Sequence, residues 1–174
     1  MDVRELAPGL WRWTALHPDW TPEEGGPEGW AQEVASFALV EDSALVLFDP
    51  LVPADDEQRF WRALDDDVRH HGPPQILLTV YWHARSAQQI AERYEDARVL
   101  GVEAGAEHMR EIAAGADTFA VGDDLPAGIE ARPTDDPEEV VFWIPAHRAL
   151  VAGDVLLGAE SRHVVVRRCF GVIR

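Results

Sequence analysis

The sequence predicts an α/β layered sandwich formed by one domain. Early apolar runs are followed by alternating strand and helix patterns, and then by a later group of short apolar runs. This order is typical of helices packed against sheets and does not fit an up-and-down helical bundle. A chain of 174 residues can bury a sizeable core in one domain but is too short to favour two.

The N-terminal part predicts three strands and an exposed loop. Large and polar residues alternate over residues 10–14, as in a strand, whereas residues 19–29 are rich in Pro, Glu and Gly. Residues 36–40 and 44–48 are apolar and are separated by three polar residues, which favours a hairpin. The dipeptide Asp49-Pro50 then ends the second strand of this hairpin.

The middle of the chain predicts a helix, a strand and a second helix. Residues 54–69 indicate an amphipathic helix, because large apolar residues recur every four positions from Phe60 to Val68. Residues 76–79 form a short apolar run, which indicates a strand buried on both faces. Ser86 begins a Ser-Ala-Gln-Gln sequence that matches a capping box, so we expect it to cap the next helix.

The second half predicts shorter elements. A strand over residues 98–102 precedes a helix over residues 103–114, which Gly115 closes. Further apolar runs then predict strands over residues 119–121, 129–132, 140–144 and 149–152.

Composition excludes several classes of function. The formal charge of −17 would repel nucleic acid and anionic lipid. All 15 basic residues are Arg, which excludes Schiff-base chemistry on Lys and a phosphate-binding lysine. Cys169 is the one cysteine, so any metal site must use His and carboxylates. Because no apolar run is long enough for a membrane helix and the N-terminus lacks the pattern of a signal peptide, we expect a soluble, cytoplasmic protein.

The C-terminal segment differs in charge from the rest of the chain. The last acidic residue is Glu160, and residues 161–174 carry four Arg. We therefore divide the chain into a domain over residues 1–160 and a basic segment over residues 161–174. This segment has three open interpretations: a final strand over residues 164–166, a basic interaction tail, or sequence foreign to the fold.

The turn over residues 81–86 carries the most information. It reads Y-W-H-A-R-S and lies between an apolar strand ending in Thr79 and a predicted helix, and residues 148–157 form a later apolar strand that contains Gly-Asp. These two segments resemble the metallo-β-lactamase superfamily, whose H-x-H-x-D-H turn and later Gly-Asp supply metal ligands. The resemblance covers residues 10–158 and implies an αββα sandwich. The superfamily's closing strands, helix and last ligand His are not recognisable, which leaves open whether the sandwich lacks part of its C-terminal half.

The resemblance also implies that most metal ligands are absent from the turn. Tyr81 stands at the position of the first His, His83 at the second, and Arg85 and Ser86 at the Asp-His pair. Only His83 is a competent ligand. The permanent charge of Arg85 would repel a divalent metal by several kcal/mol at an effective dielectric of about 20.

The other ligands implied by the resemblance come from later loops. Residues 133–139 stand where the family has a Gly-His turn; Asp135 or its neighbour is the candidate ligand there, although such an acidic run is more often a solvated loop. Asp154 stands at the family's bridging carboxylate. A charge at the end of an apolar strand is costly without a partner, so we expect Asp154 to face the cleft. It either binds a metal or pairs with Arg85 or His83, and the arginine favours the pair.

Four residues are candidate ligand-binding groups. Tyr81 and Arg85 line the cleft, and Arg85 either binds an anion beside a helix N-terminus or pairs with a carboxylate. Trp20 and Trp30 flank a loop that the resemblance places over the cleft, where they form an aromatic lid or cover the core.

The sequence therefore favours a protein of metallo-β-lactamase fold with a degraded metal site, non-catalytic or functionally diverged. It would need no cofactor and would bind a small molecule or a protein partner, and neither nucleic acid nor a membrane is expected as a partner. The alternative is a metallohydrolase that cleaves an ester, thioester or lactam with zinc or iron on His83, Asp154 and Asp135. In that case His83 and Asp154 are the catalytic residues. A third hypothesis is a regulatory subunit that uses the basic tail.

Overall fold

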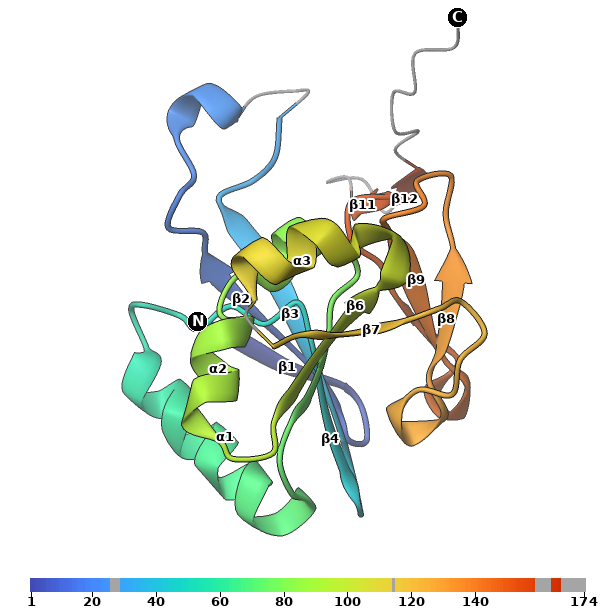
Figure 1. The fold of residues 1–174 in the computed structure, drawn as a ribbon. Coiled ribbons are helices and arrows are strands. Elements are labelled where there is room, and N and C mark those ends of the chain that lie inside the picture. The colour runs from blue at the N-terminus through green and yellow to red at the C-terminus, as the bar shows by residue number, and fades with distance from the viewer. Residues whose placement is uncertain (26–28, 114, 159–163, 167–174) are drawn as a thin grey trace, which may run out of the picture.

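The computed structural model describes residues 1–25, 29–113, 115–158 and 164–166. Its centre is a seven-stranded sheet whose strands follow one another in chain order (Figure 1). The first four strands pair antiparallel, and the pairs from the fourth to the seventh strand are parallel. The strands are β1 (Asp2–Ala7), β2 (Leu10–Leu16), β3 (Glu33–Glu41), β4 (Ala44–Phe48), β5 (Gln75–Leu77), β6 (Arg98–Val102) and β7 (Asp117–Phe119).

The first strands agree with the predicted pattern except at the edge of the sheet. β3 and β4 form the predicted hairpin, with Glu41 opposite Ala44 at its turn. The sequence does not predict β1, because five of its six residues are exposed and no alternation of buried and exposed positions marks it. The formation of β1 therefore depends on its pairing with β2 more than on the composition of β1 itself.

Three α-helices cover one face of this sheet (Figure 1). α1 (Glu57–His71) buries Phe60 and Leu64 and ends before Gly72, which has a φ of 89°. This confirms the predicted amphipathic helix, displaced by a few residues. The helix predicted over residues 103–114 is divided: a 3-10 turn at Glu103–Gly105 precedes α3 (Ala106–Ile112), because Gly105 is a poor residue for a helix interior. The remaining helix is α2 (Ala87–Arg93).

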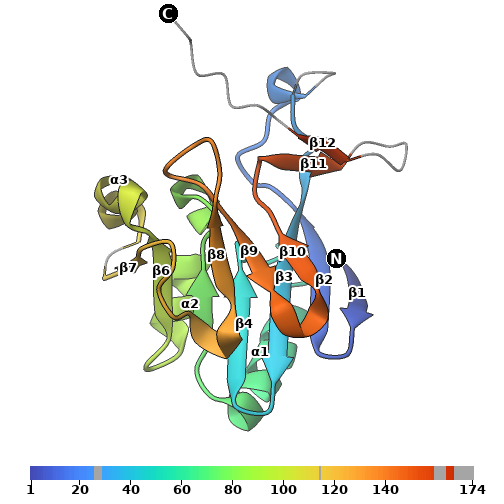
Figure 2. The ribbon, with the colours of Figure 1, turned by 90° about the vertical axis from the view of Figure 1, so that its right-hand side faces the viewer.

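A second sheet packs on the opposite face (Figure 2). It contains β8 (Glu130–Pro133), β9 (Val140–Ile144) and β10 (Ala149–Val151), all antiparallel, with β9 in the middle. Phe48 and Phe142 are fully buried, and their ring centroids lie 5.6 Å apart. The apolar cluster that contains them is separate from the cluster beneath the helices. The described residues thus form three layers: helices, large sheet and small sheet.

A short hairpin follows the second sheet. β11 (Leu156–Gly158) pairs antiparallel with β12 (Val164–Val166). Of the three interpretations of the basic segment, the structure contains the strand over residues 164–166; residues 161–163 and 167–174 lie outside the described part of the chain.

Most of the predicted αββα arrangement is present. The two sheets and the first helical layer are formed, and within the described ranges the chain after α3 forms strands and 3-10 turns without a further α-helix. None of the helices that the structure describes is both long and apolar enough to cross a membrane.

Candidate functional site

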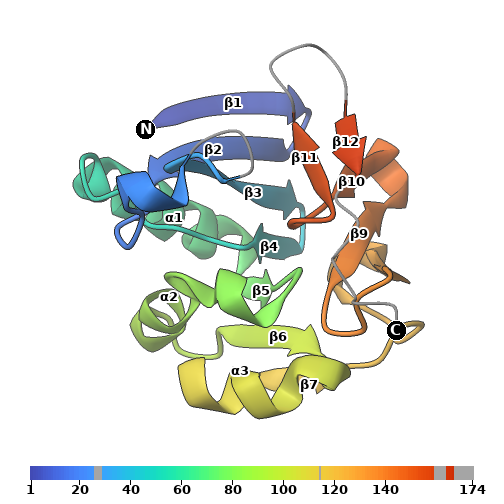
Figure 3. The same cartoon turned by 90° about the horizontal axis from the view of Figure 1, so that it is seen from above.

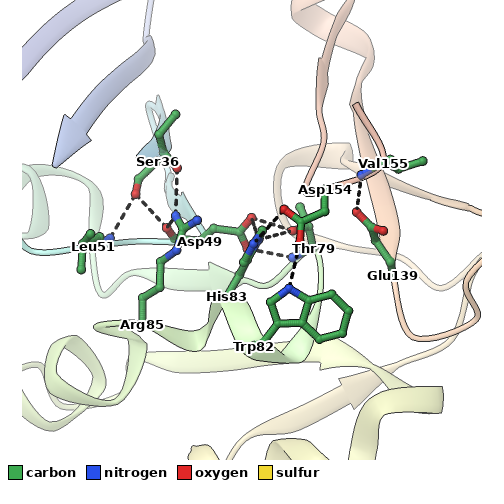
Figure 4. Close-up of polar contacts among 11 residues, drawn as sticks. Ser36, Asp49, Leu51, Thr79, Trp82, His83, Arg85, Glu139, Asp154 and Val155 are labelled. Carbon is green, nitrogen blue, oxygen red and sulfur yellow. Dashed lines mark hydrogen bonds and ion pairs between the residues drawn. The ribbon is translucent and has the colours of Figure 1, made fainter. Parts of the chain in front are cut away.

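The candidate site lies where the carboxyl ends of the central strands meet the second sheet (Figures 3 and 4). Asp49 directly follows β4, and Thr79 lies two residues after β5. His83 belongs to a 3-10 turn, Tyr81–Ala84, that follows β5. Asp154 follows β10 and therefore reaches the site from the other sheet. Loops at this end of a parallel sheet are the usual place for functional side chains.

The carboxylate of Asp49 is the centre of the hydrogen-bond network. It accepts bonds from the Thr79 backbone N–H (2.9 Å) and from the Thr79 hydroxyl (2.6 Å). Its Oδ2 also lies 3.1 Å from Nδ1 of His83. Asp49 is only 5% exposed and has a φ of 45°, a conformation that Asp tolerates better than most residues. These bonds satisfy a carboxylate that would be very costly to bury alone.

Both nitrogens of the His83 imidazole face carboxylates. Nδ1 contacts Asp49, and Nε2 lies 3.4 Å from Oδ1 of Asp154. Burial disfavours the charged ring, but the attraction of Asp49 and the hydrogen bonds to Asp154 and Asp49 outweigh it and raise the pKa of His83 to about 9. The two carboxylates therefore favour the imidazolium form of His83, which donates from both nitrogens.

Asp154 connects this turn to the second sheet. Its Oδ2 accepts a hydrogen bond of 3.0 Å from Nε1 of Trp82, while Oδ1 faces His83 (Figure 4). The Trp82 side chain remains 43% exposed. The structure thus places Asp154 beside His83 and Trp82, which are its described partners.

Arg85 binds backbone oxygens. Its Nη1 donates to the carbonyl of Ala35 (2.9 Å) and to the carbonyl of Asp49 (3.0 Å). Burial lowers the pKa of Arg85, an effect that the charges of Asp49 and Asp154 oppose. Two alternatives were expected for this residue, an anion site or a direct salt bridge. The structure instead uses the guanidinium to join β3 to the end of β4.

Ser36 completes the same junction. Its hydroxyl donates to the carbonyl of Asp49 (2.7 Å) and accepts from the N–H of Leu51 (3.0 Å), and all these groups are buried. Ser86 has a comparable role: it occupies the N-cap position of α2, but its hydroxyl accepts from the N–H of Val52. The predicted capping box is therefore wrong, because a loop amide from another part of the chain competes for the hydroxyl.

Glu139 is the most deeply buried acid near the site, with 1% exposure. Its Oε1 accepts from the N–H of Val155 (2.9 Å), whereas Oε2 has no hydrogen-bond partner among the described residues. Burial raises the pKa of Glu139, and the nearby charge of Asp154 adds to this. Gly153 passes so close that an added Cβ would lie 2.8 Å from Oε1 of Glu139 and 2.6 Å from Oγ1 of Thr79.

An aromatic cluster borders the site. The ring of Tyr81 stacks on that of His108 at 4.4 Å between centroids, and His108 lies 3.3 Å from a carboxylate oxygen of Glu138. The Trp82 ring meets Tyr81 edge to face at 4.8 Å. Tyr81, at the predicted position of a metal ligand, thus packs against another aromatic ring.

Comparison with solved structures identifies the fold. The chain aligns with the DIM-1 metallo-β-lactamase at a TM-score of 0.70 and 12% identity, covering 92% of this chain and 73% of that one. The chain also aligns with a metallo-β-lactamase from Pontibacter korlensis at a TM-score of 0.65 and 13% identity, covering 92% of this chain and 74% of that one. The chain has a metallo-β-lactamase fold. The flavodiiron protein from Giardia intestinalis also aligns, at a TM-score of 0.64 and 16% identity, covering 93% of this chain and 42% of that protein.

The metallo-β-lactamase fold predicted from the turn and the later strand is therefore confirmed, over about three quarters of the length of the first two of these structures. No family model matches the sequence, and no curated protein matches it significantly. The likeness is thus one of tertiary structure, at an identity too low to transfer an activity.

The donor set does not fit the metal centre that this fold holds elsewhere. His83 directs both ring nitrogens at carboxylates, so a metal could bind this imidazole only by displacing one of these contacts. The guanidinium of Arg85 adds a fixed positive charge close to Asp49. Within the described ranges no group of three or more His, Cys, Asp or Glu could hold a metal ion.

The remaining predicted residues are not brought into this network. Asp135, the candidate carboxylate ligand, is exposed; Glu139, four residues later, is the buried acid of that loop. Trp20 and Trp30 are half-buried, and Nε1 of Trp20 donates to the carbonyl of Trp30 (3.0 Å), which closes their own loop. Their role as a lid for a ligand stays a prediction.

Sequence reasoning missed Asp49 and Glu139. Asp49 follows the apolar run of β4 in the same way that Asp154 follows β10. The rule that selected Asp154, a charge placed at the end of an apolar strand, would have selected Asp49 too. Proline at position 50 made Asp49 resemble a simple strand terminator. Glu139 belongs to an acidic run, and the sequence does not show which acid of that run is buried.

Proposed function

We propose that this protein is a metal-independent, non-catalytic member of the metallo-β-lactamase fold that works by binding. In this proposal an internal network of ion pairs takes the place of a metal centre and holds the two sheets together. The observation that carries it is the position of His83 between Asp49 and Asp154, with both ring nitrogens engaged.

The charges of the network support this proposal. The carboxylates of Asp49 and Asp154 are balanced by the cations of His83 and Arg85, and all four side chains have hydrogen-bond or ion-pair partners. A buried pair of this kind is strongly destabilised when one member is removed. Binding of a metal through Nε2 of His83 would require deprotonation of that nitrogen and the loss of its contact with Asp154. A metal would therefore have to overcome the interactions that keep the site folded.

The binding surface in this proposal is the aromatic border of the site. Trp82 is 43% exposed, and Tyr81 and His108 stack beside it. Exposed aromatic side chains held in fixed positions are frequent in recognition surfaces for small molecules and for proteins. We propose that a small-molecule ligand or a protein partner contacts this border.

The charge of −17 supports a partner other than nucleic acid or an anionic membrane. A cytoplasmic location is part of the proposal, because a sequence with one cysteine forms no internal disulfide.

The alternative is a metallohydrolase with a reduced site. Structural likeness to proteins named metallo-β-lactamases favours it, and it would cleave an ester, thioester or lactam with a zinc or iron ion held by His83, Asp154 and a third carboxylate. Asp135 is exposed and Glu139 points at the N–H of Val155, so neither completes a ligand set as they stand. The alternative therefore requires a rearrangement that metal binding itself would have to drive.

Metal content decides between the two functions. Protein purified without chelator is analysed for zinc and iron, and its melting temperature is measured with and without EDTA. The proposal expects substoichiometric metal and an unchanged melting temperature. One metal per chain that is lost in His83→Gln, but kept in the matched control His70→Gln at an exposed helix position, would overturn it.

A further inference from the structure

An apolar groove lies on the helical face of the large sheet, away from the site described above. Its walls are α1 on one side and β1 and β2 on the other, and it encloses about 480 Å³. β1 forms the edge of the sheet (Figure 3), so on this side no further strand of the sheet closes the groove in the described structure. The volume lies in the range of pockets that hold small organic molecules.

The surface of the groove is dominated by large apolar side chains. Val3 and Trp11 line it and are more than a third exposed. Trp13 and Leu47 also line it and are buried. Exposed apolar side chains that gather around a concave surface commonly mark a place where another molecule binds.

The ionisable side chains that line the groove are Glu5 and Asp67, both acidic. Glu5 accepts a hydrogen bond from the N–H of Gly9. Asp67 is partly buried, and its carboxylate makes no hydrogen bond or ion pair with the described residues, although His71 and His70 act on it through space. A partly buried carboxylate beside an apolar surface favours a bound cation that can donate hydrogen bonds to it.

We propose that this groove binds an apolar organic cation, that is, a hydrophobic molecule carrying an ammonium group. Its apolar body packs between Trp11, Val3 and Ala63, and its ammonium group donates to Asp67. Acidic side chains at the groove select against carboxylates and phosphates, and the apolar walls select against small hydrated cations.

The test uses three ligands of nearly equal shape: 1-naphthylmethylammonium, 1-naphthylmethanol and 1-naphthylacetate. Each is titrated calorimetrically into the full chain. The ammonium compound is expected to bind at least about tenfold more tightly than the alcohol, since one charge-assisted hydrogen bond separates them. The acetate is expected to bind most weakly. Equal affinities for all three would overturn the proposal.

Variants locate the binding site. Asp67→Asn is expected to remove most of the preference for the ammonium compound while leaving the alcohol unchanged. Asp66→Asn is the matched control, because Asp66 is an exposed neighbour on α1 that pairs with Arg69. Ala63→Trp, at an exposed helix position, is expected to abolish binding of all three ligands by filling the groove. Binding that survives both Asp67→Asn and Ala63→Trp lies elsewhere and would contradict the proposal.

A second copy of the chain is the competing occupant. Sedimentation at increasing protein concentration distinguishes a second copy from the organic cation. Occupation of the groove by another copy would appear as self-association that Ala63→Trp abolishes. That result would also overturn the proposal, whereas a monomer that binds the ammonium compound supports it.

Discussion

Nδ1 of His83 lies 3.1 Å from Oδ2 of Asp49, and both side chains are almost fully buried. The two residues are 34 positions apart and follow two neighbouring parallel strands, β4 and β5. Their contact fixes the turn after β5 against the end of β4. Asp154, from the second sheet, meets the other ring nitrogen. His83 therefore links the ends of β4 and β5 to the second sheet.

Asp49→Asn is expected to lower the free energy of unfolding by about 3 kcal/mol or more, because it leaves the imidazolium of His83 without its buried counter-charge. The new amide also offers donors where the Thr79 N–H and hydroxyl already donate. Urea unfolding monitored by circular dichroism measures the loss. Asp66→Asn, at an exposed position, is the control and should change stability by less than about 0.5 kcal/mol. A similar effect of both variants would mean that the Asp49 charge is not needed.

The pH dependence of stability should report the His83 charge. Its folded pKa of about 9 lies above the ordinary value of 6.5, so the folded state binds the proton more tightly than the unfolded state. The resulting stabilisation is complete below pH 6.5 and is lost as the pH rises through 9, a loss of about 3 kcal/mol. The difference in unfolding free energy between wild type and His83→Gln should shrink by that amount across this window. A difference that stays constant from pH 6 to 9.5 would contradict the assignment.

Glu139 is expected to stabilise the fold mainly as the hydrogen-bond acceptor of the Val155 N–H. Burial raises its pKa, so the folded state disfavours the carboxylate form, and Glu139→Gln should stay within about 1 kcal/mol of wild type at pH 7. Glu139→Ala removes the acceptor of the Val155 N–H and should cost about 2 kcal/mol. Thermal unfolding of both variants makes the comparison. If the glutamine variant loses as much stability as the alanine variant, the negative charge itself is required.

Gly153→Ala is expected to destabilise the protein by about 1 to 3 kcal/mol, because the added methyl group collides with Thr79 and Glu139. Gly105→Ala is the matched control: its Cβ would meet the Tyr81 side chain at an ordinary distance of 3.7 Å, and its φ is −88°. Differential scanning calorimetry of the two variants tests the close approach of the chain after β10 to the end of β5. Equal melting temperatures would show that this approach is not tight.

The secondary structure of this protein was largely set by local pattern. The spacing of Phe60 and Leu64 predicts α1, and the two apolar runs around residues 41–43 predict the β3–β4 hairpin. β1 and the division of residues 103–114 were not predictable in this way. Edge pairing and helix ends depend on neighbours that the sequence does not place.

The candidate site also has features that the sequence predicted and features that only the tertiary structure revealed. From the sequence, the resemblance to the metallo-β-lactamase superfamily implied one usable ligand, His83, in the turn after β5 and an arginine in place of a carboxylate. The apolar run before Asp154 predicted that this carboxylate needs a partner. Only the tertiary structure brought Asp49 to His83 and selected Glu139, not Asp135, as the buried acid. The tertiary structure also places the Arg85 guanidinium where it donates to two backbone carbonyls. The reason is physical: the cost of burying a charge is visible at a strand end, but the partner that offsets the cost lies on another strand, at a distance along the chain that no local pattern encodes.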